Sequence, residues 1–128
     1  MVLYRPGICN IGKKEIRRRY ILAALGFVVS AIAFSAIVFL GFQRIWLPAL
    51  AVPLFLGFEG FYQGRFGFCA GFAAVGAYDF AGSGGSRGIV SKRTDHRKDI
   101  AMANRIHMYS AASSICVTAL LCVASFAL

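Results

Sequence analysis

The sequence predicts an all-α membrane protein with three transmembrane helices, its N-terminus in the cytoplasm and its C-terminus outside. Three observations support this fold class. The composition is too apolar for a soluble domain of 128 residues, with 59% hydrophobic residues and a mean hydropathy of +0.69. Three apolar runs approach or exceed the roughly 20 residues that a helix needs to cross a bilayer. The basic residues gather in the segments before the first run and before the third.

The distribution of charge predicts the orientation. Six of the fourteen Lys and Arg residues precede the first run, and six more lie between residues 83 and 107. Arg44 lies in the connection between the first two runs. Because basic residues accumulate on the cytoplasmic side of a membrane, we expect both basic segments inside and Arg44 outside. The net charge of +9 then reflects orientation and attraction to anionic lipid, and we expect no nucleic-acid partner.

We expect a single integral-membrane domain over residues 1–128. Its parts in chain order are a basic cytoplasmic segment (1–19), a first span (20–42), a second span (45–64) with a helical extension to about residue 80, a basic cytoplasmic loop (81–107) and a third span (108–128). Asn10 is placed to cap the helix that enters the first span. The short connection between the first two spans predicts an antiparallel hairpin of helices. Glycine and serine after Gly76 predict a flexible loop.

Five glycines form a stripe that begins in the second span and continues along its predicted extension. Gly57, Gly60, Gly64, Gly67 and Gly71 are spaced by three, four, three and four residues, so they share one face of a continuous helix. In lipid, small residues let two helix backbones approach closely, and van der Waals packing drives their association. We interpret the stripe as a helix-packing surface, through which the protein docks onto other membrane-protein subunits or a second copy.

Polar residues interrupt the same span. Glu59 and Gln63 are expected inside the membrane, whereas Arg65 is expected near the cytoplasmic interface. A charge at mid-membrane costs at least about 2.5–3.5 kcal/mol on insertion scales, so Glu59 is either a hydrogen-bonded packing residue or a functional group. His107, where the third span enters the membrane, is an interfacial anchor or an axial ligand for a haem or chlorophyll brought by a partner. The identity of any cofactor stays open.

Two cysteines, Cys9 and Cys69, are expected near the cytoplasmic interface. In the reducing cytosol they are inert thiols, a redox or sulfur-carrying pair, or part of a metal site. Arg65 precedes Cys69 by four residues on the extended helix, and a positive charge there favours the reactive thiolate. Cys116 and Cys122 are interpreted as apolar fillers of the third span. Complete metal-ligand sets, nucleotide-binding loops and catalytic triads are missing from the sequence, so no metal site or catalytic residue is predicted, and enzymatic activity stays open.

The segments around these cysteines resemble known families. The sequences Cys9-Asn10-Ile11-Gly12 and Phe68-Cys69-Ala70-Gly71-Phe72 resemble a family of short, uncharacterised bacterial membrane proteins with a CNIG-type start and an FCAGF-type box. From about Asn10 to Gly76 the layout is also remotely similar to small inner-membrane domains found beside or fused to rhodanese sulfur-transfer domains. This chain has Cys69-Ala70 where those domains often have Cys-Pro, and it adds a third span. The resemblances imply a multi-pass protein of the bacterial inner membrane, and the remote one implies a role in sulfur transfer.

These observations lead to three hypotheses. The first is an accessory or structural subunit of a larger membrane protein complex that docks through the glycine-rich second span. The second is a thiol-dependent membrane protein that handles sulfur, redox equivalents or a metal through Cys9 and Cys69. The third is a small oligomeric transporter in which Glu59 is the polar residue of the pathway.

Overall fold

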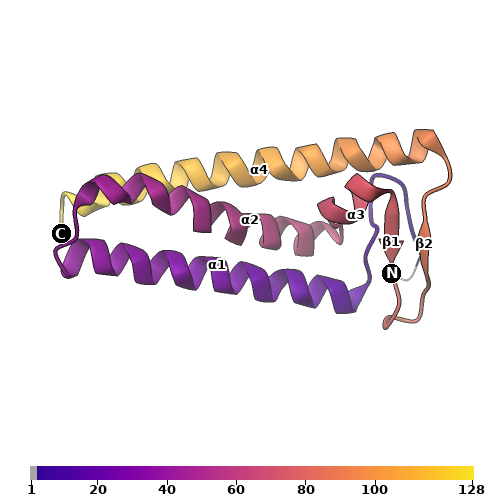
Figure 1. The fold of residues 1–128 in the computed structure, drawn as a ribbon, viewed down its shortest axis with the longest axis horizontal. Helices are drawn as coiled ribbons and strands as arrows, with labels where there is room; N and C mark the ends of the chain where they lie inside the picture. The colour runs from indigo at the N-terminus through magenta and orange to yellow at the C-terminus, as the bar shows by residue number, and fades with distance from the viewer. Residues whose placement is uncertain (1–2) are drawn as a thin grey trace.

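The computed structural model describes residues 3–128, and the chain is mostly helical, with 71% of its residues in helices. Its long segments are α1 (Lys13–Phe39), the 3-10 helix η1 (Arg44–Leu50) leading into α2 (Ala51–Phe66), and α4 (Arg93–Ser125). Its short elements are α3 (Ala70–Val75), β1 (Ala77–Asp79) and β2 (Arg87–Ile89). The long helices lie side by side, and the short elements gather at one end of the bundle beside the N-terminal segment (Figure 1).

Three helical segments are long and apolar enough to cross a membrane, Lys13–Phe39, Arg44–Phe66 and Arg93–Ser125. The expectation of a multi-pass membrane protein with three such helices is thereby confirmed. Two of the helices start before the expected spans. The first begins inside the basic N-terminal segment, and the third begins inside the region expected to be a loop. Their charged first turns therefore extend beyond the apolar part of each helix.

The backbones of α1 and α2 lie close together because the glycines at their contact have no side chains. A Cβ on Gly26 of α1 would lie 2.6 Å from the backbone nitrogen of Gly57. A Cβ on Gly60 would lie 2.7 Å from the carbonyl oxygen of Arg19. No side chain fits at these distances, so the two backbones touch directly, as small residues allow in lipid. The glycine face of α2 is therefore covered by α1 of the same chain.

The glycine stripe does not continue as one helix beyond α2. Gly67 adopts a left-handed conformation, with φ of 63°, and ends the helix. The N–H of Phe68 then donates back to the carbonyl of Gln63 at 3.0 Å, which satisfies the end of the helix. Gly71 belongs to α3, which ends at Val75. The helical extension expected up to about residue 80 is therefore replaced by a turn, a short helix and a strand.

The segment expected to be a flexible loop after Gly76 contains an antiparallel hairpin. In it, β1 and β2 place Tyr78 opposite Gly88, where the missing side chain makes room for the tyrosine ring. The N-terminal segment lies alongside β1. Gly12 donates its N–H to the carbonyl of Asp79 at 3.0 Å, and Asp79 donates its N–H to the carbonyl of Asn10 at 2.9 Å. These partners come from a distant part of the chain, so composition alone could not predict the hairpin.

Helix α4 packs against α2 and α3. We call the end of the bundle that holds α3, the hairpin and the N-terminal segment the polar end. The buried core at this end consists of Phe68, Ala70, Ala73, Met102, Ala103 and Ile106. Further along α4, the buried side chains of Ser110 and Ser114 donate to carbonyls of their own helix. Because these hydroxyls find partners within the helix, the small side chains permit close packing without leaving a polar group unpaired.

Candidate functional site

Cys69 lies in the connection between α2 and α3, at the polar end of the bundle, and only 4% of the residue is exposed. Its sulfur accepts hydrogen bonds from Nη2 of Arg19 at 3.2 Å and from the backbone N–H of Phe72 at 3.5 Å. Cys69 is the N-cap residue of α3, which directs the Phe72 amide at the sulfur. The Cys69 sulfur therefore has one side-chain cation and one backbone donor within hydrogen-bonding distance.

The cation beside Cys69 is Arg19, not Arg65 as the sequence predicted. Nη2 of Arg19 also lies 3.5 Å from Oε2 of Glu15, and Oε1 of Glu15 accepts from Arg18 at 2.6 Å. Arg65 is exposed in the last turn of α2, and that helix ends before Cys69. The expectation that Arg65 and Cys69 share a helix face is wrong, because the relation between residues four apart requires a continuous helix.

Asn10 holds the backbone of Cys69. The asparagine is fully buried, its Oδ1 accepts from the N–H of Cys69 at 2.6 Å, and its Nδ2 donates to the carbonyl of Cys69 at 3.0 Å. The backbone N–H of Asn10 donates to the carbonyl of Gly67 at 3.2 Å. The expected role of Asn10 as a helix cap is wrong. Gly12 is the N-cap of α1, with no side-chain hydrogen bond. The Asn10 side chain instead supplies the acceptor for the N–H of Cys69 and a second donor to its carbonyl, which also accepts from the N–H of Ala73 at 3.1 Å.

The second candidate thiol lies near the same turn. Cys9 is buried, its sulfur donates to the carbonyl of Leu3 at 3.5 Å, and its Cβ lies 3.8 Å from where a Cβ on Gly67 would be. Both cysteines are free. Among residues 3–128, no group of three or more His, Cys, Asp or Glu side chains is close enough to hold a metal ion. The fold therefore brings the segments of Cys9 and Cys69 together without joining their sulfurs.

Glu59 pairs with a residue of α4. Its Oε1 lies 2.6 Å from Nδ1 of His107 and accepts from Nε2 of Gln63 at 3.2 Å. Oε2 of Glu59 and Oε1 of Gln63 are buried and have no partner within the described part of the chain. The His107 side chain is half exposed. Its pairing with Glu59 requires the register between α2 and α4, which the sequence does not reveal, and its role as an axial ligand stays a prediction.

Asp99 is a buried polar residue that no pattern in the sequence singles out. This carboxylate is fully buried in α4, where it accepts from the hydroxyl of Tyr4 at 2.6 Å and from the N–H of Gly7 at 2.8 Å. Burial raises the pKa of Tyr4 well above its usual value, and the hydrogen bond to Asp99 raises it further. The N-terminal segment is therefore attached both to α4, through Asp99, and to the α2–α3 turn, through Asn10. In the sequence, Asp99 follows a basic run and looks like one more solvated charge.

No protein-family model matches the sequence, and no curated protein or solved structure shows significant similarity to it.

Proposed function

We propose that the protein is a thiol-dependent membrane protein in which Cys69 accepts a sulfur atom and passes it on. The observation that supports this proposal is the pair of donors, Arg19 and the amide of Phe72, on the sulfur of Cys69. Asn10 holds that sulfur in a defined place through its bonds to the Cys69 backbone. The resemblance to domains associated with rhodaneses suggests sulfur as the cargo.

In the proposed step, the Cys69 thiolate attacks the outer sulfur of a persulfide donor, R–S–SH. A new S–S bond forms on Cys69 as the S–S bond of the donor breaks, and the departing thiolate takes up the proton that the Cys69 thiol has lost. The products are a Cys69 persulfide and R–SH, so the exchange needs no further oxidant or reductant. Arg19 assists by stabilising negative charge on sulfur before the attack.

We further propose that the polar end of the bundle faces the cytoplasm and that the membrane is the bacterial inner membrane. The N-terminal segment, the first turns of α1, the hairpin and the start of α4 together carry most of the basic residues, and they lie together at this end (Figure 1). At the opposite end Arg44 donates to the carbonyl of Ser125, beside the C-terminus. By the positive-inside rule, Cys69 would then lie on the cytoplasmic side, where protein thiols are kept reduced.

The proposal is tested by treating the purified protein with glutathione persulfide and measuring by mass spectrometry which cysteines gain a sulfur atom. We expect Cys69 to gain sulfur before Cys116, although Cys116 is exposed and Cys69 is buried. Arg19→Gln should lower the loading of Cys69. Arg65→Gln, a matched change at the same end of the bundle, should leave it unchanged. Preferential loading of Cys116, or undiminished loading in Arg19→Gln, would contradict the proposal.

The accessory-subunit hypothesis uses the glycine stripe of the second span as its docking surface. Helix α1 covers Gly57, Gly60 and Gly64 in this chain, so a partner subunit would have to use another surface. Extraction from the native membrane in mild detergent, followed by native electrophoresis and mass spectrometry, tests the hypothesis. A defined large complex would support it, and migration of the chain alone would oppose it. In the transporter hypothesis, Glu59 would act through its Oε2, because His107 and Gln63 both bind its Oε1; loss of transport by Glu59→Gln in reconstituted vesicles is the result that this hypothesis requires.

A further inference from the structure

Glu15 is a buried carboxylate beside the candidate site, and the proposed sulfur transfer gives it no part. It lies in the first turn of α1, where the helix dipole favours negative charge. Its side chain is only 9% exposed. Because removing a carboxylate from water is costly unless it is paired, the partners of Glu15 indicate its role.

Two arginines of the same helix pair with Glu15. Arg18 and Arg19 follow it by three and four residues, so the three side chains share one face of α1. Nη1 of Arg18 lies 2.6 Å from Oε1 of Glu15, and Nη2 of Arg19 lies 3.5 Å from Oε2. The Arg18 side chain is 60% exposed and that of Arg19 is 21% exposed. Arg18 therefore offsets the charge of Glu15 at the surface, whereas Arg19 continues the pairing towards the interior.

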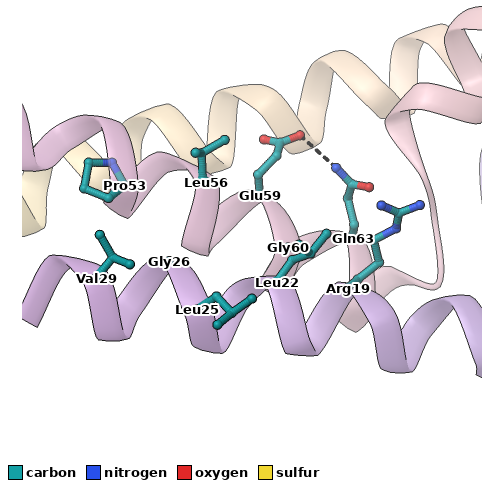
Figure 2. Close-up of a pocket in the computed structure, with 10 residues that line it drawn as sticks. All are labelled: Arg19, Leu22, Leu25, Gly26, Val29, Pro53, Leu56, Glu59, Gly60 and Gln63. Carbon is teal, nitrogen blue, oxygen red and sulfur yellow. Dashed lines mark hydrogen bonds between the residues drawn. The ribbon is translucent and has the colours of Figure 1, made fainter.

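Arg19 connects Glu15 to Cys69. Its side chain leaves α1 and extends towards the end of α2 (Figure 2), where Nη2 donates to the sulfur of Cys69 at 3.2 Å. This nitrogen carries two N–H groups, one for each of its two acceptors. Within residues 3–128 the guanidinium has no further hydrogen bond or ion pair, and its Nε is buried without a partner. Apart from the sulfur itself, Glu15 is therefore the group that directs Nη2.

We infer that Glu15 is a positioning residue that holds Nη2 of Arg19 on the sulfur of Cys69. A free arginine side chain has many rotamers, and a fixed anion at its guanidinium reduces that freedom before the thiolate forms. With the thiolate, the four groups alternate in charge from Arg18 through Glu15 and Arg19 to Cys69. This role rests on the proposed function, because it concerns the thiol that is proposed to react.

The test measures by mass spectrometry how fast iodoacetamide, a small uncharged reagent, alkylates Cys69 in the full-length protein. Glu15→Ala and Arg19→Gln should each slow alkylation about tenfold, because both remove the charge-assisted hydrogen bond to the sulfur. Glu15→Gln keeps an acceptor for Nη2 and should stay within about threefold of the wild type. Asp95→Ala removes a negative charge from the first turn of α4, at the same end of the bundle, and should not change the rate.

A double variant separates positioning from a general effect on stability. Because Glu15 acts through Arg19, Glu15→Ala combined with Arg19→Gln should be no slower than Arg19→Gln alone. Multiplied effects, an unchanged rate in Glu15→Ala, or a Glu15→Gln variant as slow as Glu15→Ala would overturn the inference. New alkylation of the buried Cys9 in Glu15→Ala would also overturn it, because Glu15 would then hold the fold of this end.

The alkylation test needs no persulfide, so its result is independent of sulfur loading. If the variants alter alkylation as expected but Cys69 takes up no sulfur, the proposed function fails and the role of Glu15 stands. If Cys69 takes up sulfur and Glu15→Ala alkylates at the rate of the wild type, the role of Glu15 fails and the proposed function stands.

Discussion

Asn10 is the residue on which the arrangement of the candidate site depends most. Each of its polar atoms has a partner. The side chain binds both backbone groups of Cys69, the N–H binds Gly67, and the carbonyl binds Asp79. A fully satisfied polar group in a buried place specifies one arrangement of its neighbours, because every alternative leaves a donor or acceptor unpaired.

We expect Asn10→Ala to destabilise the protein by about 1–3 kcal/mol, because it leaves the buried N–H of Cys69 without an acceptor. The measurement is the midpoint of thermal unfolding in detergent. Asn104→Ala, at an exposed position of α4, is the matched control and should change the midpoint little. Equal midpoints for the two variants would show that the contacts of Asn10 with Cys69 do not hold this end of the bundle together.

Tyr4 should titrate at unusually high pH. Burial and the hydrogen bond to Asp99 raise its pKa, so the fold stabilises the neutral hydroxyl. This contribution is fully present below the ordinary tyrosine pKa of about 10 and is lost as the pH rises through the raised value. The difference between the tyrosinate absorbance of the wild type and that of Tyr4→Phe should therefore appear above the ordinary range. A difference centred near the ordinary pKa would contradict the buried bond.

At the scale of elements, the packing of α1 against α2 rests on backbone contact. In water, glycine in a helix interior costs about 1 kcal/mol relative to alanine. In lipid that cost is offset by the close approach of two helices, which Gly26 and Gly60 make possible here. The same approach leaves an apolar groove beside it, so the spacing of the two helices controls both their contact and the width of that groove.

Gly60→Ala should destabilise the protein by about 1–3 kcal/mol, the usual cost of overpacking, because its Cβ would lie 2.7 Å from the carbonyl oxygen of Arg19. Gly71→Ala is the matched control. Its Cβ would lie 3.7 Å from the sulfur of Cys69, an ordinary contact distance. Detergent-induced unfolding followed by circular dichroism measures both variants. If Gly60→Ala proved as stable as Gly71→Ala, α1 and α2 would not be in direct backbone contact.

At the scale of the whole molecule, the structure has two unlike ends. One end holds the N-terminal segment, α3 and the hairpin, and the other holds the α1–η1 turn and the C-terminus (Figure 1). The three apolar helices between them are long enough to cross a membrane. The two ends should therefore be exposed on opposite sides of the membrane.

Labelling with a membrane-impermeant maleimide tests this arrangement in a Cys116→Ser background. Ser86→Cys and Gln43→Cys introduce exposed thiols at the two ends. In intact cells we expect Gln43→Cys to react and Ser86→Cys to be protected, with the pattern reversed in inverted vesicles. If both thiols reacted from the same side of the membrane, the chain could not cross it three times. If Ser86→Cys reacted in intact cells and Gln43→Cys was protected, the proposed orientation would be reversed.

Three helices able to span a membrane could be predicted from the amino-acid sequence alone. Apolar length is a local property of the sequence, which is why the three helices could be predicted. The glycine spacing defines one face only where a single helix continues, and in the structure Gly57, Gly60 and Gly64 lie against α1 of the same chain and not against a partner. The same rule failed at Gly67, where a positive φ ends α2. A glycine that breaks a helix and a glycine that packs one look alike in the sequence.

The make-up of the candidate site, by contrast, depends on contacts between distant parts of the chain. Arg19 and Cys69 are 50 residues apart in the sequence, and Asn10 and Cys69 are 59 residues apart. The cation that lies beside the thiol is determined by the register between α1 and the α2–α3 turn. Side-chain packing and backbone hydrogen bonds together set that register. The pairing of Glu59 with His107 depends in the same way on the register of α2 and α4. A local pattern contains no information about that register, because contacts between helices are made by residues that are distant in the chain.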